Sequence, residues 1–227
     1  KIVNALADEI SGAKTILALG CGEGHTTKQI LDRFDYDDYE CDLLEPNNNA
    51  LNNATAFLKS ENNIGKSFPN TLANFKTDKK YDAVFTSHTN YYWALNQEDF
   101  DRQLKKILDL VDDKGQLLIL TLPEESDHYN IAISEIYPKF NYSQHMIEYY
   151  KKLGHKVEVK RFKMRMYVGD ILSTKKMFDL KSFYRFIHNT DVYPSDKEAE
   201  LFLGKIKKYV KKDYLDFKDD LIIVKKL

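Results

Sequence analysis

The sequence predicts an α/β fold built on a mostly parallel sheet. Near-continuous apolar strands alternate with amphipathic helices from Thr15 to Pro123, and such strands are typical of parallel sheets that are covered on both faces. A glycine-rich turn, Gly20 to Gly24, directly follows the first strand. The chain of 227 residues is 43% hydrophobic and 30% charged, which suits one globular domain with a large core.

Sequence periodicity places the other elements of this alternating region. Helices are expected where apolar residues recur at helical spacing, as Leu51, Ala54 and Leu58 do. The expected helices are His25–Phe34, Asn48–Ser60 and Glu98–Val111. The expected strands are Thr15–Leu19, Tyr39–Pro46, Ile64–Phe68, Tyr81–His88 and Gln116–Leu122, the last of them after a chain break at Gly115.

The second half of the chain has a different pattern. Its expected elements are a helix at Ser143–Gly154, a strand at His155–Val168, helices at Phe178–Ile187 and beyond Ser195, and a strand at Leu221–Val224. The alternation of apolar and polar residues along the long strand shifts by one position near Lys160–Arg161. Such a shift predicts a bulge or bend. Ser195 and Glu198 form a capping-box signature. We expect a single domain over residues 1–227, with a helical insertion at about 169–217.

The glycine-rich turn and the acid that ends the second strand predict a nucleotide-type cofactor site. Glycine lets the backbone pass close to a ligand or adopt a positive φ without a Cβ clash. Glu45 lies about twenty residues beyond the turn, where an acid can accept hydrogen bonds from a ribose diol. The spacing of Gly20, Gly22 and Gly24 is GxGxG, which disfavours the GxGxxG turn of NAD-dependent oxidoreductases.

These motifs resemble those of class I S-adenosylmethionine (SAM) dependent methyltransferases. The segments ILALGCGEGHTTKQIL and LLEPNNNAL match the glycine and acidic motifs of that superfamily. More narrowly, YDAVFTSHTNYYWAL and DLKSFYRFIHNTDVYPSDKEAELFLGKI are similar to segments of histamine N-methyltransferase and its relatives. The resemblance implies a Rossmann-like seven-stranded, mostly parallel sheet with an antiparallel last strand and a helical insertion before it. It also implies SAM as the cofactor and methyl transfer as the activity.

The resemblance assigns cofactor roles to residues near the ends of four strands. The expected cofactor-binding residues are Gly20, Cys21, Gly22, Gly24, Glu45, Pro46, Asn47, Asn70, Thr71, Ser87 and His88. Among them Glu45 would bind the ribose diol, and Asn47 would reach the adenosine. Cys21 lies between two glycines, so a small turn residue is a better interpretation of it than a nucleophile.

Aromatic residues after the fourth strand and in the later segments are candidates for the acceptor side. Aromatic faces attract a sulfonium or a cationic substrate, and His88 can take up a proton near neutral pH. The expected substrate-binding residues are His88, Tyr91, Tyr92, Trp93, Tyr129 and Tyr184, with Tyr137 and Phe183 as further walls of the pocket. His88 is the candidate catalytic residue, and the alternative is that it only hydrogen-bonds the backbone. For the later aromatic residues, a place in the core is the alternative at helical spacing.

Some positions depart from the family pattern and leave the acceptor open. Ala18 stands where the superfamily usually has an acid, and His88 stands where the histamine enzyme has a substrate-binding glutamine. The segment FKDDL lacks that enzyme's asparagine. We therefore expect methylation of a small molecule, with an amine nitrogen as one candidate. The alternatives are a protein side-chain methyltransferase and a non-catalytic SAM-binding subunit.

Composition excludes several other classes of protein. The formal net charge of −1 gives no sign of a nucleic-acid surface, and no apolar run approaches the roughly 18 residues of a membrane span. The two cysteines, Cys21 and Cys41, form neither a disulfide framework nor a metal site. We expect a cytoplasmic protein whose partner is a small methyl acceptor and which binds no metal.

Overall fold

The computed structural model describes residues 1–60, 62–133, 142–174, 176–188 and 192–226. Tyr137, one of the expected pocket walls, lies outside these ranges. The chain forms two compact units. The first unit comprises Lys1–Thr121, Phe140–Lys160 and Asp220–Leu227, and the second unit comprises Leu122–Lys139 and Arg161–Asp219.

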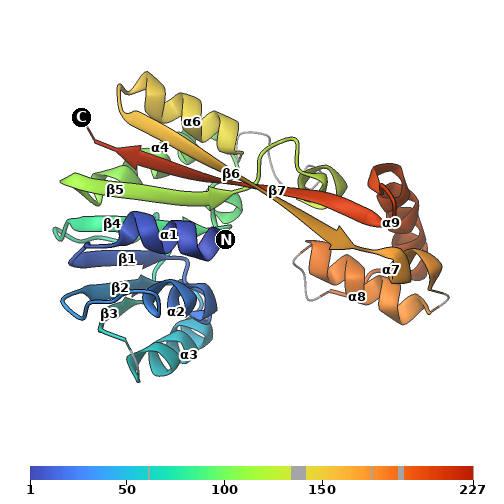
Figure 1. Cartoon of the computed structure of the whole chain (residues 1–227), viewed down its shortest axis with the longest axis horizontal. Coiled ribbons are helices and arrows are strands. Elements are labelled where there is room, and N and C mark those ends of the chain that lie inside the picture. The colour runs from blue at the N-terminus through green and yellow to red at the C-terminus, as the bar shows by residue number, and fades with distance from the viewer. Residues whose placement is uncertain (61, 134–141, 175, 189–191, 227) are drawn as a thin grey trace. The chain divides into compact units, whose positions relative to one another are not determined.

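The central sheet has seven strands in the order β3-β2-β1-β4-β5-β7-β6 (Figure 1). The strands are β1 Thr15–Leu19, β2 Glu40–Leu44, β3 Ile64–Phe68, β4 Tyr81–Ser87, β5 Val111–Thr121, β6 Lys156–Tyr167 and β7 Tyr214–Lys225. The pairs β1–β2, β1–β4, β2–β3 and β4–β5 are parallel, whereas β5 and β7 are antiparallel. The predicted mostly parallel sheet with an antiparallel last strand is confirmed.

Helices of the first unit cover the sheet. They are α1 Ile2–Ile10, α2 His25–Leu31, α3 Asn48–Lys59, α4 Gln97–Asp109 and α6 Ser143–Lys152, with a 3₁₀ turn, η1, at Asn90–Tyr92. Apolar side chains of α4 and α6, such as Leu104 and Met146, pack with alternate strand residues such as Leu17 in one core. Helix α1 was not expected from the sequence, although Leu6 and Ile10 lie at helical spacing and are buried.

Gly115 lies inside β5, so the predicted chain break there is wrong. The β4–β5 register changes from Tyr81 opposite Val111 to Ala83 opposite Gln116, which marks a bulge. A Cβ atom on Gly115 would lie 2.7 Å from the carbonyl oxygens of Tyr81 and Asp82. The glycine therefore allows β5 to pass close to β4 and continue as one strand.

Among the described residues, three helices lie between β6 and β7 along the chain. They are α7 Gly169–Ser173, α8 Met177–His188 and α9 Asp196–Tyr209. With a π-helical turn, η2, at Tyr129–Ile133, they form the core of the second unit, which includes Leu180, Ile187 and Phe202. The capping box is confirmed, because Ser195 and Glu198 exchange the two expected hydrogen bonds. Within β6, the boundary between the two units falls at Lys160–Arg161. At the same place the alternation of apolar and polar residues along β6 shifts by one position.

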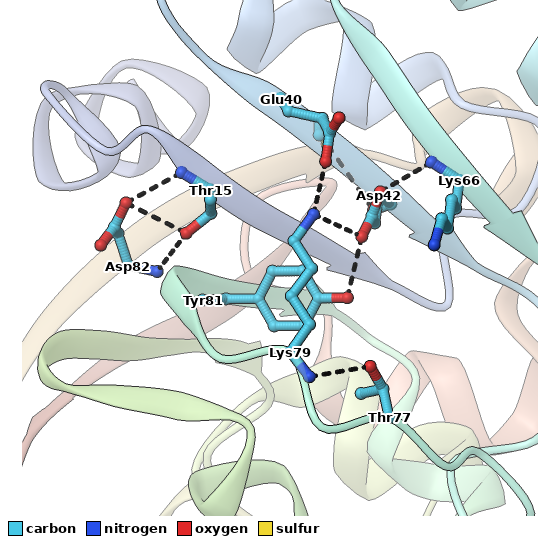
Figure 2. Close-up of polar contacts among 9 residues, drawn as sticks. Thr15, Glu40, Asp42, Lys66, Thr77, Lys79, Tyr81 and Asp82 are labelled. Carbon is cyan, nitrogen blue, oxygen red and sulfur yellow. Dashed lines mark hydrogen bonds and ion pairs between the residues drawn. The ribbon is translucent and has the colours of Figure 1, made fainter.

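Polar side chains join neighbouring strands of the sheet through hydrogen bonds and an ion pair (Figure 2). The Asp42 carboxylate, whose side chain is 0% exposed, accepts hydrogen bonds from the Lys66 amide at 2.7 Å, Lys79 Nζ at 2.8 Å and Tyr81 Oη at 2.9 Å. Asp82 accepts a hydrogen bond from the Thr15 amide at 2.8 Å. These contacts join β1 to β4 and join β2 to β3 and β4.

No helix within the described ranges has both the length and the apolar character that crossing a bilayer would require.

Candidate functional site

The turn after β1 has the left-handed backbone that its glycines predict. Gly20, Gly22 and Gly24 have φ angles of 67°, 54° and 86°. The Gly20 amide donates a 2.7 Å hydrogen bond to the Leu44 carbonyl oxygen, which fixes the turn against the end of β2. Glycine adopts these angles without the steric cost that other residues incur. The glycine turn therefore lies at the carboxyl ends of β1 and β2, where α/β sheets bind ligands.

The three glycines face different surroundings. A Cβ atom on Gly20 would collide with the Thr89 side chain, and one on Gly24 would lie 3.1 Å from the Ala54 side chain of α3. Apart from Gly22 itself and its two neighbours in the chain, no heavy atom of the described chain lies within 4 Å of the position that a Cβ on Gly22 would occupy. Gly20 and Gly24 are therefore required for packing, whereas Gly22 faces open space in which a ligand can lie.

Glu45 connects this turn to the start of α3. Its Oε2 atom accepts a hydrogen bond from the Gly22 amide and its Oε1 atom accepts one from the Asn47 amide, each at 3.0 Å. The side chain is half-buried. A carboxylate has about four lone-pair sites, so each oxygen that binds the backbone keeps capacity for a further donor. Glu45 is thus fixed beside Gly22 with acceptor capacity for a diol.

Cys21 is a half-buried residue of the glycine turn. Burial, and then the nearby Glu45 carboxylate, raise the pKa of its thiol to about 12. A thiol with such a pKa is protonated near pH 7, and the thiolate is the reactive form. The environment therefore supports the interpretation of Cys21 as a small turn residue over that of a nucleophile.

The expected adenosine-side residues lie at the ends of β2 and β3. Asn47 is the N-cap of α3, and its Oδ1 atom accepts hydrogen bonds from the Asn49 and Ala50 amides. Pro46 is exposed beside it. Thr71 accepts a hydrogen bond from the Asn74 amide and so begins a turn after β3, with Asn70 just before it. The side-chain amide oxygen of Asn47 is therefore used in capping α3. Contact of Pro46, Asn47, Asn70 and Thr71 with a cofactor stays a prediction.

The segment after β4 lies beside the glycine turn. Ser87 is the last residue of β4, and His88 follows it with a φ of 55°. The His88 amide donates a 2.9 Å hydrogen bond to the Leu120 carbonyl oxygen of β5. Thr89 packs against Gly20 and its hydroxyl bonds the Thr86 hydroxyl. The structure thereby brings His88 and the glycine turn to one edge of the sheet.

The three aromatic residues after His88 have different environments. Tyr91 is buried, and Trp93 stacks on the core residue Phe100 with ring centroids 5.9 Å apart. Tyr92 is 59% exposed. Tyr92 is therefore the ring of this segment that is open to a ligand, whereas Trp93 has a packing role in the first unit.

The two other expected acceptor-side residues belong to the second unit. Tyr129 is buried there, and Tyr184 stacks on His188 with ring centroids 3.8 Å apart. Both contribute to the interior of that unit. Their contact with an acceptor stays a prediction.

Sequence reasoning missed Thr121, and it placed Thr89 only among the candidate acceptor-side residues after the fourth strand, without its packing role. Thr89 fills the space beside Gly20, and the buried Thr121 hydroxyl donates a hydrogen bond to Tyr91 Oη at 3.4 Å. Both contacts join different strands or loops. No local pattern in the sequence marks them, because a threonine in or after an apolar strand is an ordinary residue.

Solved structures of methyltransferases are similar to this chain. A putative methyltransferase from Bacillus halodurans has a TM-score of 0.63 and 13% identity, covering 98% of this chain and 96% of its own. A SAM dependent methyltransferase from Archaeoglobus fulgidus has a TM-score of 0.60 and 16% identity, covering 99% and 91%. The N-methyltransferase NodS from Bradyrhizobium japonicum, in complex with S-adenosyl-L-homocysteine, has a TM-score of 0.58 and 9% identity, covering 99% and 84%.

Comparison by sequence finds no match among family profiles or curated proteins. Because the identities to the solved structures are so low, the likeness concerns the arrangement of the backbone. Strand order, the parallel and antiparallel pairing and near-complete coverage agree on one conclusion: this chain has the Rossmann-like fold of the class I SAM-dependent methyltransferases.

Proposed function

We propose that the protein is a SAM-dependent methyltransferase that transfers a methyl group to a small molecule. The observation that carries this proposal is the placement of Glu45 beside Gly22. The carboxylate is held by two backbone amides, and the glycine faces open space. A carboxylate so placed can bind the ribose diol of a cofactor that lies over the turn. The similarity of the fold to solved methyltransferase structures supports the same proposal.

The residues present fit SAM. Glu45 would hold the ribose, and the open side of Gly22 would admit the methionine part close to the backbone. When bound, SAM supplies an electrophilic methyl group on a sulfonium. The protein's own contribution is to align the acceptor's lone pair with that methyl and to exclude water. Positioning of this kind is worth roughly 7–11 kcal/mol in favourable cases, so a strong catalytic base is not required.

The acceptor side is proposed around His88 and Tyr92. His88 follows β4 beside the glycine turn, and the Tyr92 ring is exposed. The narrower likeness to histamine N-methyltransferase rests on sequence segments, and His88 replaces that family's glutamine. An amine nitrogen is therefore one candidate acceptor, and histamine itself is not proposed. A protein side chain as acceptor, or SAM binding without turnover, would each appear as an outcome of the experiments below.

Titration calorimetry tests the cofactor. We expect micromolar binding of SAM and of S-adenosyl-L-homocysteine, and no comparable binding of NAD, because the turn has GxGxG spacing and is followed by Glu45. Absence of both binding heat and a thermal shift with either sulfur ligand would overturn the proposal. Binding of SAM without methyl transfer to any small molecule or protein fraction would favour the non-catalytic alternative.

Gly22→Val is expected to abolish measurable SAM binding. The branched side chain would occupy the open space beside Glu45. Gly12→Val is the matched control, because Gly12 also has a positive φ, of 86°, and also faces open space, but lies between α1 and β1. In both variants the left-handed backbone should lower the free energy of unfolding by about 1–2 kcal/mol. Urea unfolding measures this loss. Equal SAM affinity in the two variants would place the cofactor elsewhere.

A further inference from the structure

The side chain of Thr89 packs on the backbone of the glycine turn. A Cβ atom on Gly20 would lie 2.9 Å from Thr89 Cβ, and the atom nearest to it would be the Thr89 methyl carbon, Cγ2. In a close-packed contact, movement of one partner requires movement of the other. The first glycine of the turn therefore has a side chain from the loop after β4 directly against it.

The backbone after β4 brings Thr89 to this place. His88 has a φ of 55°, in the left-handed region that non-glycine residues rarely adopt. Such conformations cluster at functional sites because the surrounding structure must impose them. The His88 amide donates a 2.9 Å hydrogen bond to the Leu120 carbonyl oxygen of β5, whereas Thr89 contacts the glycine that follows β1. Within one residue the chain thus passes from β5, on one side of β4, to β1 on the other side.

A pair of hydroxyl groups fixes the rotamer of Thr89. The Thr89 hydroxyl is hydrogen-bonded to the hydroxyl of Thr86, which is 1% exposed and lies opposite Leu19 in the β1–β4 register. Threonine carries its hydroxyl and methyl groups on one carbon, so a bond that fixes the hydroxyl also fixes the methyl group. The bond to Thr86 therefore holds the Thr89 methyl group against Gly20.

Thr89 also begins the segment that carries an exposed aromatic ring. It is the N-cap of η1, and its carbonyl oxygen accepts a 3.1 Å hydrogen bond from the Tyr92 amide. The Tyr92 side chain is 59% exposed. One residue therefore contacts the glycine turn through its side chain and holds the acceptor-side segment through its backbone.

We propose that Thr89 is a positioning residue that couples SAM binding to the order of the acceptor-side segment, residues 89–93. This inference rests on the proposed function. The Thr89 methyl group holds the glycine turn in the conformation that binds SAM, and bound SAM in turn holds residues 89–93 through the same contact. Coupling between two sites is reciprocal, so SAM and the methyl acceptor each raise the affinity for the other.

Two substitutions at Thr89 separate the methyl contact from the hydroxyl bond. Thr89→Ser keeps the hydroxyl and removes the methyl group, so the turn spends less time in its binding conformation and the apparent affinity falls in proportion. Calorimetry should show SAM binding about fivefold weaker, as expected for one lost methyl contact. Thr89→Val keeps the branched shape and loses the bond to Thr86, and its SAM affinity should stay close to the native value.

Urea unfolding of the same two variants shows whether Thr89 has only a structural role. Thr89→Val removes a hydrogen bond of the buried Thr86 hydroxyl, so we expect it to lose more stability than Thr89→Ser. Stability and SAM affinity should therefore fall in opposite orders in the two variants. Native SAM affinity in Thr89→Ser, or an affinity at least as low in Thr89→Val, would overturn the proposal.

Hydrogen exchange tests the coupling without any acceptor. The Tyr92 and Trp93 amides are hydrogen-bonded within the η1 turn, and saturating S-adenosyl-L-homocysteine should slow their exchange several-fold in the native protein. The slowing should be smaller in saturated Thr89→Ser. The control is the Gly154 amide at the end of α6, which donates a 3.0 Å hydrogen bond to the Lys151 carbonyl oxygen and should keep its rate. Exchange at Tyr92 and Trp93 that the ligand leaves unchanged, or slows equally in both proteins, would contradict the coupling.

Calorimetry on the native protein separates failure of this inference from failure of the proposed function. If the native protein binds neither SAM nor S-adenosyl-L-homocysteine, the proposed function fails and the coupling falls with it. If both ligands bind, and either Thr89→Ser keeps the native affinity or the exchange of residues 89–93 does not respond, the positioning role of Thr89 alone fails.

Discussion

Replacing Glu45 with alanine is expected to weaken SAM binding by about a hundredfold while the protein stays folded. The variant loses the acceptor for the ribose diol, and hydrogen bonds to a charged group are worth roughly 1.5–3 kcal/mol each. It also frees the amides of Gly22 and Asn47, which the carboxylate now binds at 3.0 Å each. Because Glu45 is only half-buried, its removal leaves no cavity in the core. Calorimetry gives the affinity, and circular dichroism gives the folded fraction.

Glu23→Ala is the control for this result. Glu23 is an exposed acid in the same turn, and its Oε1 atom accepts a hydrogen bond from Asn53 Nδ2. Removing it changes the local charge by the same amount without touching the expected ribose position. If SAM affinity falls equally in the two variants, Glu45 acts through its negative charge alone and not through hydrogen bonds to the ribose. An unchanged dissociation constant in Glu45→Ala would make Glu45 an ordinary surface acid.

Lys79→Met is expected to lower the free energy of unfolding by about 3 kcal/mol. The substitution leaves the fully buried Asp42 carboxylate with the Tyr81 hydroxyl and the Lys66 amide as donors but without a cationic partner. Breaking a buried ion pair by removal of one partner typically costs 3–5 kcal/mol. We take the lower end because the Lys79 side chain is 31% exposed. Urea unfolding at pH 7 measures the change.

Lys14→Met provides the matched control for the ion pair. Lys14 and Asp38 also form a short ion pair, at 2.7 Å, but their side chains are 71% and 82% exposed. Water screens such a pair, so its loss should change stability little. A loss in Lys79→Met no larger than the loss in Lys14→Met would mean that solvent reaches Asp42 in the folded protein.

The order of elements was predictable because it depends on local patterns. The short strand at Ile64–Phe68 has the predicted bounds, and Ser195 and Glu198 form the predicted capping box. The glycine turn and Glu45 are close in sequence and lie on neighbouring parallel strands, so their contact follows from the β-α-β arrangement itself. Periodicity and turn chemistry need only a few residues of context.

Contacts between distant segments were not predictable. Trp93 stacks on Phe100 of α4, a packing contact that the sequence did not indicate, and its contact with an acceptor stays a prediction. The need for a glycine at position 20 is explained by Thr89, which comes from another loop. Gly115 resembles a chain break in sequence and is a bulge residue in the sheet. In each case the partner, and not the residue itself, decides the role.

The position of β7 in the sheet affects how the protein can be made. β7 is the last of the seven strands along the chain, yet it pairs with β5 and lies between β5 and β6. During synthesis the amide and carbonyl groups along that side of β5 therefore stay without their partner until almost the whole described chain has left the ribosome. An open strand edge of this kind invites pairing with other chains. The pairing of Leu221 to Val224 with β5 is thus the late step that protects this edge from association with neighbouring molecules.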